Sequence, residues 1–91
     1  MIQSRILDKY QKAHDAHLDA AAKARRYDSI HTAALRAGFP GPFHDEGVAF
    51  ATWMDACNAT GYQVIEQIMS GEIDPPTVEE YIAMLPALAL P

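Results

Sequence analysis

The stretch from Phe43 to Gly71 carries the densest apolar pattern of the chain, and its apolar positions recur mostly every three or four residues. This spacing predicts one long amphipathic helix over about residues 44–70, around which the other segments fold. We expect Gly71 to end it in the left-handed conformation, and a second backbone to approach Gly61 closely. The apolar face comprises Phe50, Met54, Cys57, Gly61, Val64, Ile65 and Ile68, and Trp53 widens it.

A second helical pattern covers about residues 2–26, without a proline or glycine to interrupt it. A helix of that length spans about 38 Å, close to the length of the central helix, which favours an antiparallel pair. Its first part, residues 1–16, has a sparse apolar stripe that either packs along the central helix or projects to pair with a second copy. The expected inner stripe is Ile2, Ile6, Tyr10, Ala13, His17, Ala20 or Ala21, and Ala24.

Two shorter helices are predicted from capping and breaking residues. Asp28 or Ser29 suits the N-cap of a helix over about residues 29–37, and the loop at 38–43 follows, where we expect Phe39 and Phe43 to plug the end of the core. Thr77 and Glu80 match a capping box that opens a last helix over about residues 78–85. The chain is therefore predicted to be all-α: a small helical bundle forming a single domain over residues 1–91, with two long antiparallel helices and two short ones.

Composition and charge narrow the class of function. A net charge of −5 with only seven basic residues argues against nucleic acid as a partner. Hydrophobic residues make up 49% of the chain, but many are alanines that bury little surface. A homo-oligomer would bury additional apolar surface between its copies. No apolar run suits a signal peptide or a membrane span of about 20 residues, so we expect a cytoplasmic protein without a membrane partner. Cys57, the single cysteine, is expected to be a buried hydrophobe.

Histidines and acids supply the only candidates for chemistry. His14 and His17 stand one helical turn apart and could share a metal ion, but a third ligand such as His31 or His44 would have to come from elsewhere. The alternative is a partly buried His17 with His14 on the solvated face. His44 and Glu46 could act as acid and base, although acids at a helix start are more typical of caps. The sequence therefore predicts a non-enzyme without a catalytic site, cofactor or metal.

The junction from Arg25 to Asp28 is the most polar part of the chain. The helix dipole favours cations near the C-terminal end of a helix. Here a cap for the next helix follows these cations along the chain. The alternative is a binding surface, or a buried polar cluster that joins Arg26, Tyr27 and an acid of the central helix such as Glu46.

From His17 to Leu85 the chain resembles a small domain of tailed bacteriophages and prophages. The motifs that carry the resemblance are His17-Leu18-Asp19, Arg25-Arg26-Tyr27-Asp28-Ser29-Ile30, Pro42-Phe43, Glu46-Gly47-Val48-Ala49-Phe50-Ala51-Thr52-Trp53 and Pro76-Thr77-Val78-Glu79-Glu80-Tyr81-Ile82-Ala83-Met84-Leu85-Pro86. The chain departs from that pattern at Arg26, where the family often has glycine, and at Met54, where it often has arginine. It also lacks the second tryptophan that frequently follows the first.

The resemblance implies a role in a phage tail operon, either as a tail-fibre assembly chaperone or as a minor tail component. The partner would be a tail-fibre or other tail protein, and the location the host cytoplasm or the virion. The alternative is a small phage protein that binds and inhibits a host factor. The candidate structural or interaction residues are His17, Arg26, Tyr27, Asp28, Phe43, Glu46, Trp53, Thr77 and Glu80.

Overall fold

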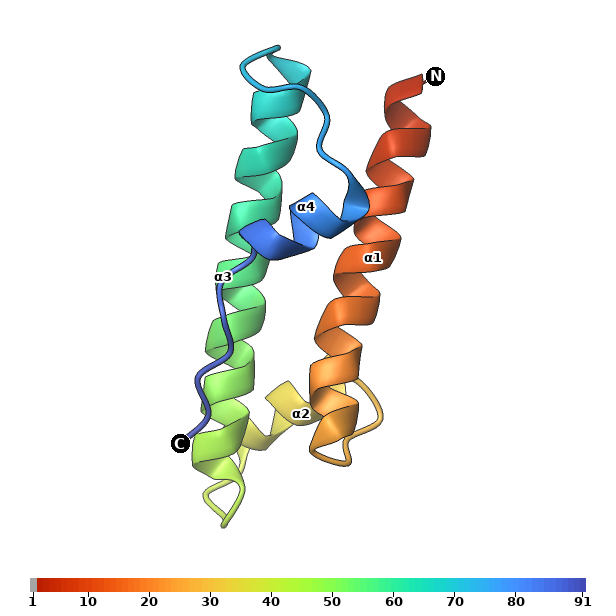
Figure 1. The fold of residues 1–91 in the computed structure, drawn as a ribbon. Coiled ribbons are helices and arrows are strands. Elements are labelled where there is room, and N and C mark those ends of the chain that lie inside the picture. The colour runs from red at the N-terminus through yellow and green to blue at the C-terminus, as the bar shows by residue number, and fades with distance from the viewer. Residues whose placement is uncertain (1) are drawn as a thin grey trace.

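Two long helices run in opposite directions along the molecule in the computed structural model, which describes the backbone of residues 2–91 and the side chains from Leu7 onward (Figure 1). Within that range the chain forms α1 (Ile2–Ala24), α2 (Ile30–Leu35), the short 3-10 helix η1 (Arg36–Gly38), α3 (His44–Met69) and α4 (Val78–Met84), with no strand. The predicted all-α class is confirmed. Three of the predicted helices differ from the observed ones only at their ends, and the one predicted over about residues 29–37 is divided between α2 and η1.

The short helices hold the two long ones apart. The closest backbone packing joins α2 and η1 to α3, while α1 packs more closely against α4 than against α3. Figure 1 shows α4 lying across the gap between the long helices at mid-height and α2 closing the gap near one end. The long helices run antiparallel (Figure 1), and the His14–Asn58 hydrogen bond and the packing of His17 on Trp53 join them directly.

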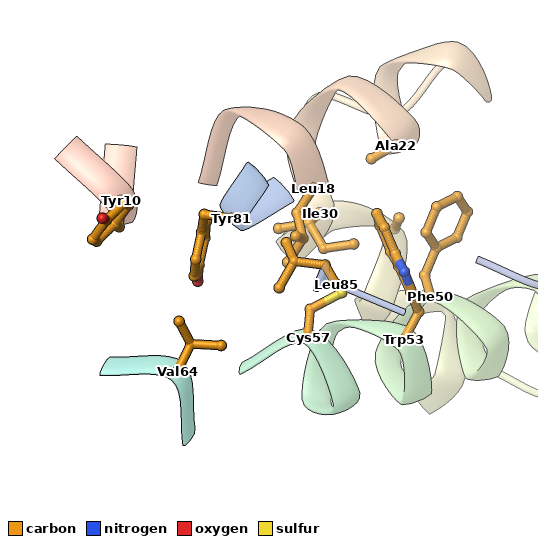
Figure 2. Packing of buried hydrophobic residues seen from close by; sticks show 11 residues of the cluster. Tyr10, Leu18, Ala22, Ile30, Phe50, Trp53, Cys57, Val64, Tyr81 and Leu85 are labelled. Atoms are coloured by element: carbon orange, nitrogen blue, oxygen red, sulfur yellow. The ribbon is translucent and has the colours of Figure 1, made fainter. Parts of the chain in front are cut away.

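The core fills this gap with large side chains from all four α-helices. Figure 2 shows Trp53 and Phe50 rising from α3 toward α1, with Leu18 beside them. The polar atom of the indole is satisfied, because Trp53 Nε1 donates to the carbonyl of Pro86 at 2.7 Å. The buried core residues are Tyr10, Leu18, Ala22, Ile30, Ala33, Phe50, Trp53, Cys57, Val64, Tyr81 and Leu85.

The buried stripe of α1 differs from the prediction after Tyr10. The buried positions step by four through His14, Leu18 and Ala22, whereas Ala13 and His17 are only half-buried. Burying the side chain of Leu18 removes more apolar surface from water than burying Ala13 does, and α1 faces α4 as well as α3. The inner face is therefore rotated by one residue from the one that we expected.

The expected projection of residues 1–16 does not include Tyr10 or His14, which are packed in the domain. Tyr10 is 3% exposed, and its hydroxyl donates to the carbonyl of Pro76 at 2.6 Å just before α4. His14 is also buried. Any projecting part is thus restricted to residues before Tyr10, and the side chains of residues 1–6 lie outside those that the structure describes.

Two glycines of α3 permit close packing, but not in the way expected. A Cβ on Gly61 would meet side chains, with the Tyr81 hydroxyl oxygen 2.7 Å away, so the predicted second backbone does not lie there. Gly47 is the residue that a second backbone approaches, because a Cβ there would lie 2.4 Å from the amide nitrogen of Ala37. Gly71 has a φ of 80° after the end of α3, as predicted.

The two phenylalanines of the loop after η1 do not plug the core. Phe39 and Phe43 are 58% and 53% exposed. The end of the core is closed instead by Tyr27, whose ring packs edge-on against Phe50 with centroids 5.9 Å apart. Tyr27, next to the turn that ends α1, occupies this position, so the prediction that Phe39 and Phe43 plug the core is wrong.

Candidate functional site

The chain leaves α1 through a tight turn that carries two arginines. The amide of Tyr27 donates to the carbonyl of Ala22 at 3.1 Å, and that of Arg26 donates to Lys23 at 2.9 Å. These two hydrogen bonds form a Schellman motif, which requires a left-handed residue at its corner. Arg26 takes that position with a φ of 71° and is the only described non-glycine residue with a positive φ. Its backbone conformation is one that L side chains disfavour.

Arg25 rather than Arg26 joins the turn to α3. The Arg25 guanidinium donates to Glu46 across 2.8 Å, whereas Arg26 is exposed at the corner of the turn. The predicted cluster therefore exists around Tyr27 and Glu46, but its arginine is Arg25 instead of Arg26. Burial raises the pKa of Glu46, but hydrogen bonds with Arg25 and Tyr27 and the Arg25 charge outweigh it, so the net shift is downward. Burial raises the pKa of Tyr27, and Glu46 raises it to a smaller extent.

A cavity of about 590 Å³ opens beside this cluster, between the end of α1, α2 and the start of α3. We call it the arginine cavity, because Arg25, Arg26 and Arg36 line it together with Tyr27, Phe43 and Glu46. Three of the four arginines of an otherwise acidic chain thus meet at one hollow. Asp28 also lies on its wall and is exposed.

An exposed apolar surface adjoins the arginine cavity where α2 connects to α3. We call it the aromatic end and define it as Leu35, Arg36, Phe39 and Phe43. Leu35 is 66% exposed, and both phenylalanines are more than half exposed. The Arg36 guanidinium lies 5.8 Å from the ring centroid of Phe39 and 6.0 Å from that of Phe43, within cation–π range. Phe43 and Arg36 belong to both surfaces, so the two form one continuous region.

A second cavity, of about 300 Å³, lies between α1 and α3 above His14. His14 is 5% exposed, its Nδ1 lies 2.7 Å from the Tyr81 hydroxyl and its Nε2 lies 2.8 Å from Oδ1 of Asn58. Burial raises the pKa of Tyr81. Nε2 of His14 donates to Oδ1 of Asn58, because an amide oxygen can only accept. The prediction of a solvated His14 is wrong, because the inner face of α1 is rotated toward α4.

The two histidines of α1 do not form a metal site. Both ring nitrogens of His14 are engaged in hydrogen bonds, and the His17 ring instead packs against Trp53 with centroids 5.7 Å apart. Nδ1 of His44 lies 3.1 Å from the carbonyl of Phe39 at the other end of the core. Among the residues that the structure describes, no group of three histidine, cysteine or acidic side chains is placed to hold a metal ion.

The remaining predicted residues hold the fold together. Thr77 and Glu80 form the capping box of α4, with Glu80 N–H donating to Thr77 Oγ1 at 3.1 Å and Thr77 N–H donating to Glu80 Oε1 at 2.8 Å. Trp53 is a core residue, and Ser29 caps α2 as one of the two predicted candidates. Cys57 is buried as expected, and burial raises the pKa of its thiol.

Sequence reasoning missed the partners that meet only in three dimensions. Asn58 is not part of the apolar face predicted for the central helix, yet it contacts His14 on α1. Asp19 of α1 accepts a hydrogen bond from the amide of Ile30 at 2.9 Å. This gives a partner to one of the backbone N–H groups in the first turn of α2 that have none within the helix. No local signal marks either pair, since their members are separated by eleven residues or more.

Comparison with protein-family models, with curated proteins and with solved structures finds no match to this chain. None of the helices formed by residues 2–91 combines the length and apolar character needed to cross a membrane.

Proposed function

We propose that this protein is a non-enzymatic bacteriophage tail-operon accessory protein that works by binding another protein. The observation that carries the proposal is the exposure of Phe39 and Phe43 around Arg36 at one end of the molecule. The resemblance of residues 17–85 to a tailed-phage domain supplies the biological setting.

The chemistry of the aromatic end is that of a protein interface. Burying a phenylalanine side chain contributes about 1.5–3 kcal/mol, so leaving two of them in water forgoes stability in a small domain. Aromatic side chains and arginine are enriched where proteins bind one another, and they dominate binding energy there. The aromatic end is therefore best explained as the surface that a partner covers.

Within a tail operon, the partner is a tail-fibre or other tail protein, and the role is that of an assembly chaperone or a minor tail component. Self-association into a homo-oligomer belongs to the same proposal, since a second copy would also bury apolar surface. Both roles place the protein in the bacterial host during virion assembly.

Co-purification with the products of the genes that flank its own tests this function. We expect a tagged protein to retain a tail protein, and Phe39→Ser combined with Phe43→Ser to abolish retention without changing the helical circular dichroism. Tyr62→Ser is the matched control, because Tyr62 is 78% exposed on α3 outside the aromatic end. Equal retention by the wild type and the double variant would remove the aromatic end as the docking surface.

The same experiment distinguishes the tail-operon role from the alternative, a phage protein that binds and inhibits a host factor. Retention of one host protein, with no flanking gene product and with the same dependence on Phe39 and Phe43, would replace the tail-operon role. Light scattering of the purified protein reports self-association, which the proposal expects the double variant to lose.

A further inference from the structure

We propose that the arginine cavity binds an acidic side chain, aspartate or glutamate, that stands next to an apolar residue on a segment of the partner protein. The inference rests on the proposed function, because the cavity is continuous with the aromatic end through Arg36 and Phe43. It adds the chemistry of the occupant: a carboxylate for the arginines and an apolar neighbour for the aromatic rings.

The charge around the cavity favours an anion although the protein as a whole repels one. The chain has a net charge of −5, yet Arg25, Arg26 and Arg36 converge here. Glu46 is neutralised by Arg25. This is the one salt bridge among the side chains from Leu7 to Pro91, so Arg26 and Arg36 face the cavity without a carboxylate partner in that part of the chain, and the single charge of Asp28 does not balance both.

The backbone of Arg26 supports a role for its side chain. Glycine would occupy the left-handed corner of the turn without strain, and arginine does not. The turn requires a left-handed residue at this corner but not an arginine, so the strained arginine points to a function of its side chain. Here the strained corner holds a guanidinium at the mouth of a cavity that has two further arginines on its wall.

The cavity walls favour a protein segment over a nucleic acid. Tyr27 and Phe43 supply aromatic surface for an apolar neighbour of the carboxylate. A nucleic acid would need basic residues spread along an extended face, whereas these arginines gather at one hollow of an acidic protein. Arginine pairs with carboxylates through two parallel hydrogen bonds, which gives both strength and orientation.

NMR titration with two dipeptides tests the proposal. The probe is N-acetyl-glutamyl-phenylalanine amide, and its neutral counterpart carries glutamine in place of glutamate. We expect saturable shifts of the amides of Arg26, Arg36 and Phe43 with the acidic probe, and affinity at least about tenfold weaker for the neutral one. Inorganic phosphate is the third probe, and tighter binding of phosphate than of the acidic dipeptide would overturn the proposal.

Arg26→Gly separates loss of the charge from loss of the fold. This substitution removes the guanidinium while relieving the strained turn, so unfolding cannot explain weaker binding. We expect Arg26→Gly and Arg36→Gln each to weaken the acidic probe about tenfold, and Lys23→Gln, an exposed cation outside the cavity, to leave its affinity unchanged. Equal affinity in the wild type and both arginine variants would overturn the proposal.

The proposed function and this inference can fail separately. If Phe39→Ser with Phe43→Ser abolishes partner retention while Arg26→Gly and Arg36→Gln leave it intact, the aromatic end docks the partner and the cavity takes no carboxylate. If the arginine variants dissolve a complex between two copies of this chain, the occupant of the cavity is a second copy, which overturns this inference and leaves the self-association of the proposed function standing.

Discussion

The Tyr81 hydroxyl lies 2.7 Å from Nδ1 of His14, so this hydrogen bond joins α1 to α4, and it lies where a side chain at Gly61 of α3 would stand. A Cβ at Gly61 would sit 2.7 Å from the hydroxyl oxygen and 3.5 Å from Cε1 of His14. Only the distance to the Tyr81 hydroxyl is too short for a real Cβ, so it is the hydroxyl in its hydrogen-bonded position that requires the glycine.

Gly61→Ala is expected to destabilise the protein by about 1–3 kcal/mol, because the new methyl group displaces the Tyr81 hydroxyl from His14. Urea unfolding followed by circular dichroism measures the change. Gly38→Ala is the control, since nothing lies within 4 Å of its Cβ position. In a double-mutant cycle, Tyr81→Phe should make Gly61→Ala less costly, because removing the hydroxyl opens the space. Strict additivity of the two substitutions would contradict this reading.

Gly47→Ala is expected to cost about 3 kcal/mol or more. Its Cβ would lie 2.4 Å from the amide nitrogen of Ala37 and 2.5 Å from the carbonyl carbon of Arg36, and a backbone cannot move aside as a side chain can. The helix–helix packing of η1 on α3 would have to open. Thermal unfolding compares this variant with Gly38→Ala, and similar melting temperatures for the two would show that η1 does not pack on α3 at Gly47.

Arg26→Gly is expected to raise the free energy of unfolding by about 1 kcal/mol. Relief of the left-handed conformation at φ 71° exceeds the entropy that glycine adds to the unfolded chain. Arg26→Ala keeps the strain and is the matched control, so it should not stabilise. If glycine and alanine have the same effect in chemical denaturation, the charge rather than the backbone determines stability here.

Glu46 should make the protein less stable in acid. Burial raises the pKa of Glu46, but its hydrogen bonds with Arg25 and Tyr27 lower it by more, so the net pKa lies below the ordinary value of 4.5. A depressed carboxyl pKa contributes stability above the unfolded value, and this contribution is lost as the pH falls through the folded value. Glu46→Gln should therefore cost up to about 1 kcal/mol at neutral pH, since Arg25 is half-exposed, and progressively less below pH 4.5. A pH-independent difference in urea midpoint between the two proteins would contradict it.

The helices themselves are predictable because their signals are local. The apolar period of residues 44–70 gives α3, and Thr77 with Glu80 gives the start of α4, since a capping box acts within one helical turn. The left-handed stop at Gly71 follows in the same way. Each of these features depends on residues a few positions apart, so the local amino-acid sequence is enough to specify it.

The candidate site depends on contacts that local signals do not specify. A rotation of α1 by one residue moves its inner face by about 100°, so α4 and Leu18 together select His14 over His17 for burial. Because α1 ends in a Schellman turn, Arg25 reaches Glu46 and Arg26 is left at the mouth of the cavity. Tyr27 packs against Phe50 at the end of the core, and Phe39 and Phe43 lie on the surface. The chain's periodicity thus specifies the helices, whereas their packing specifies which side chains remain free to meet a partner.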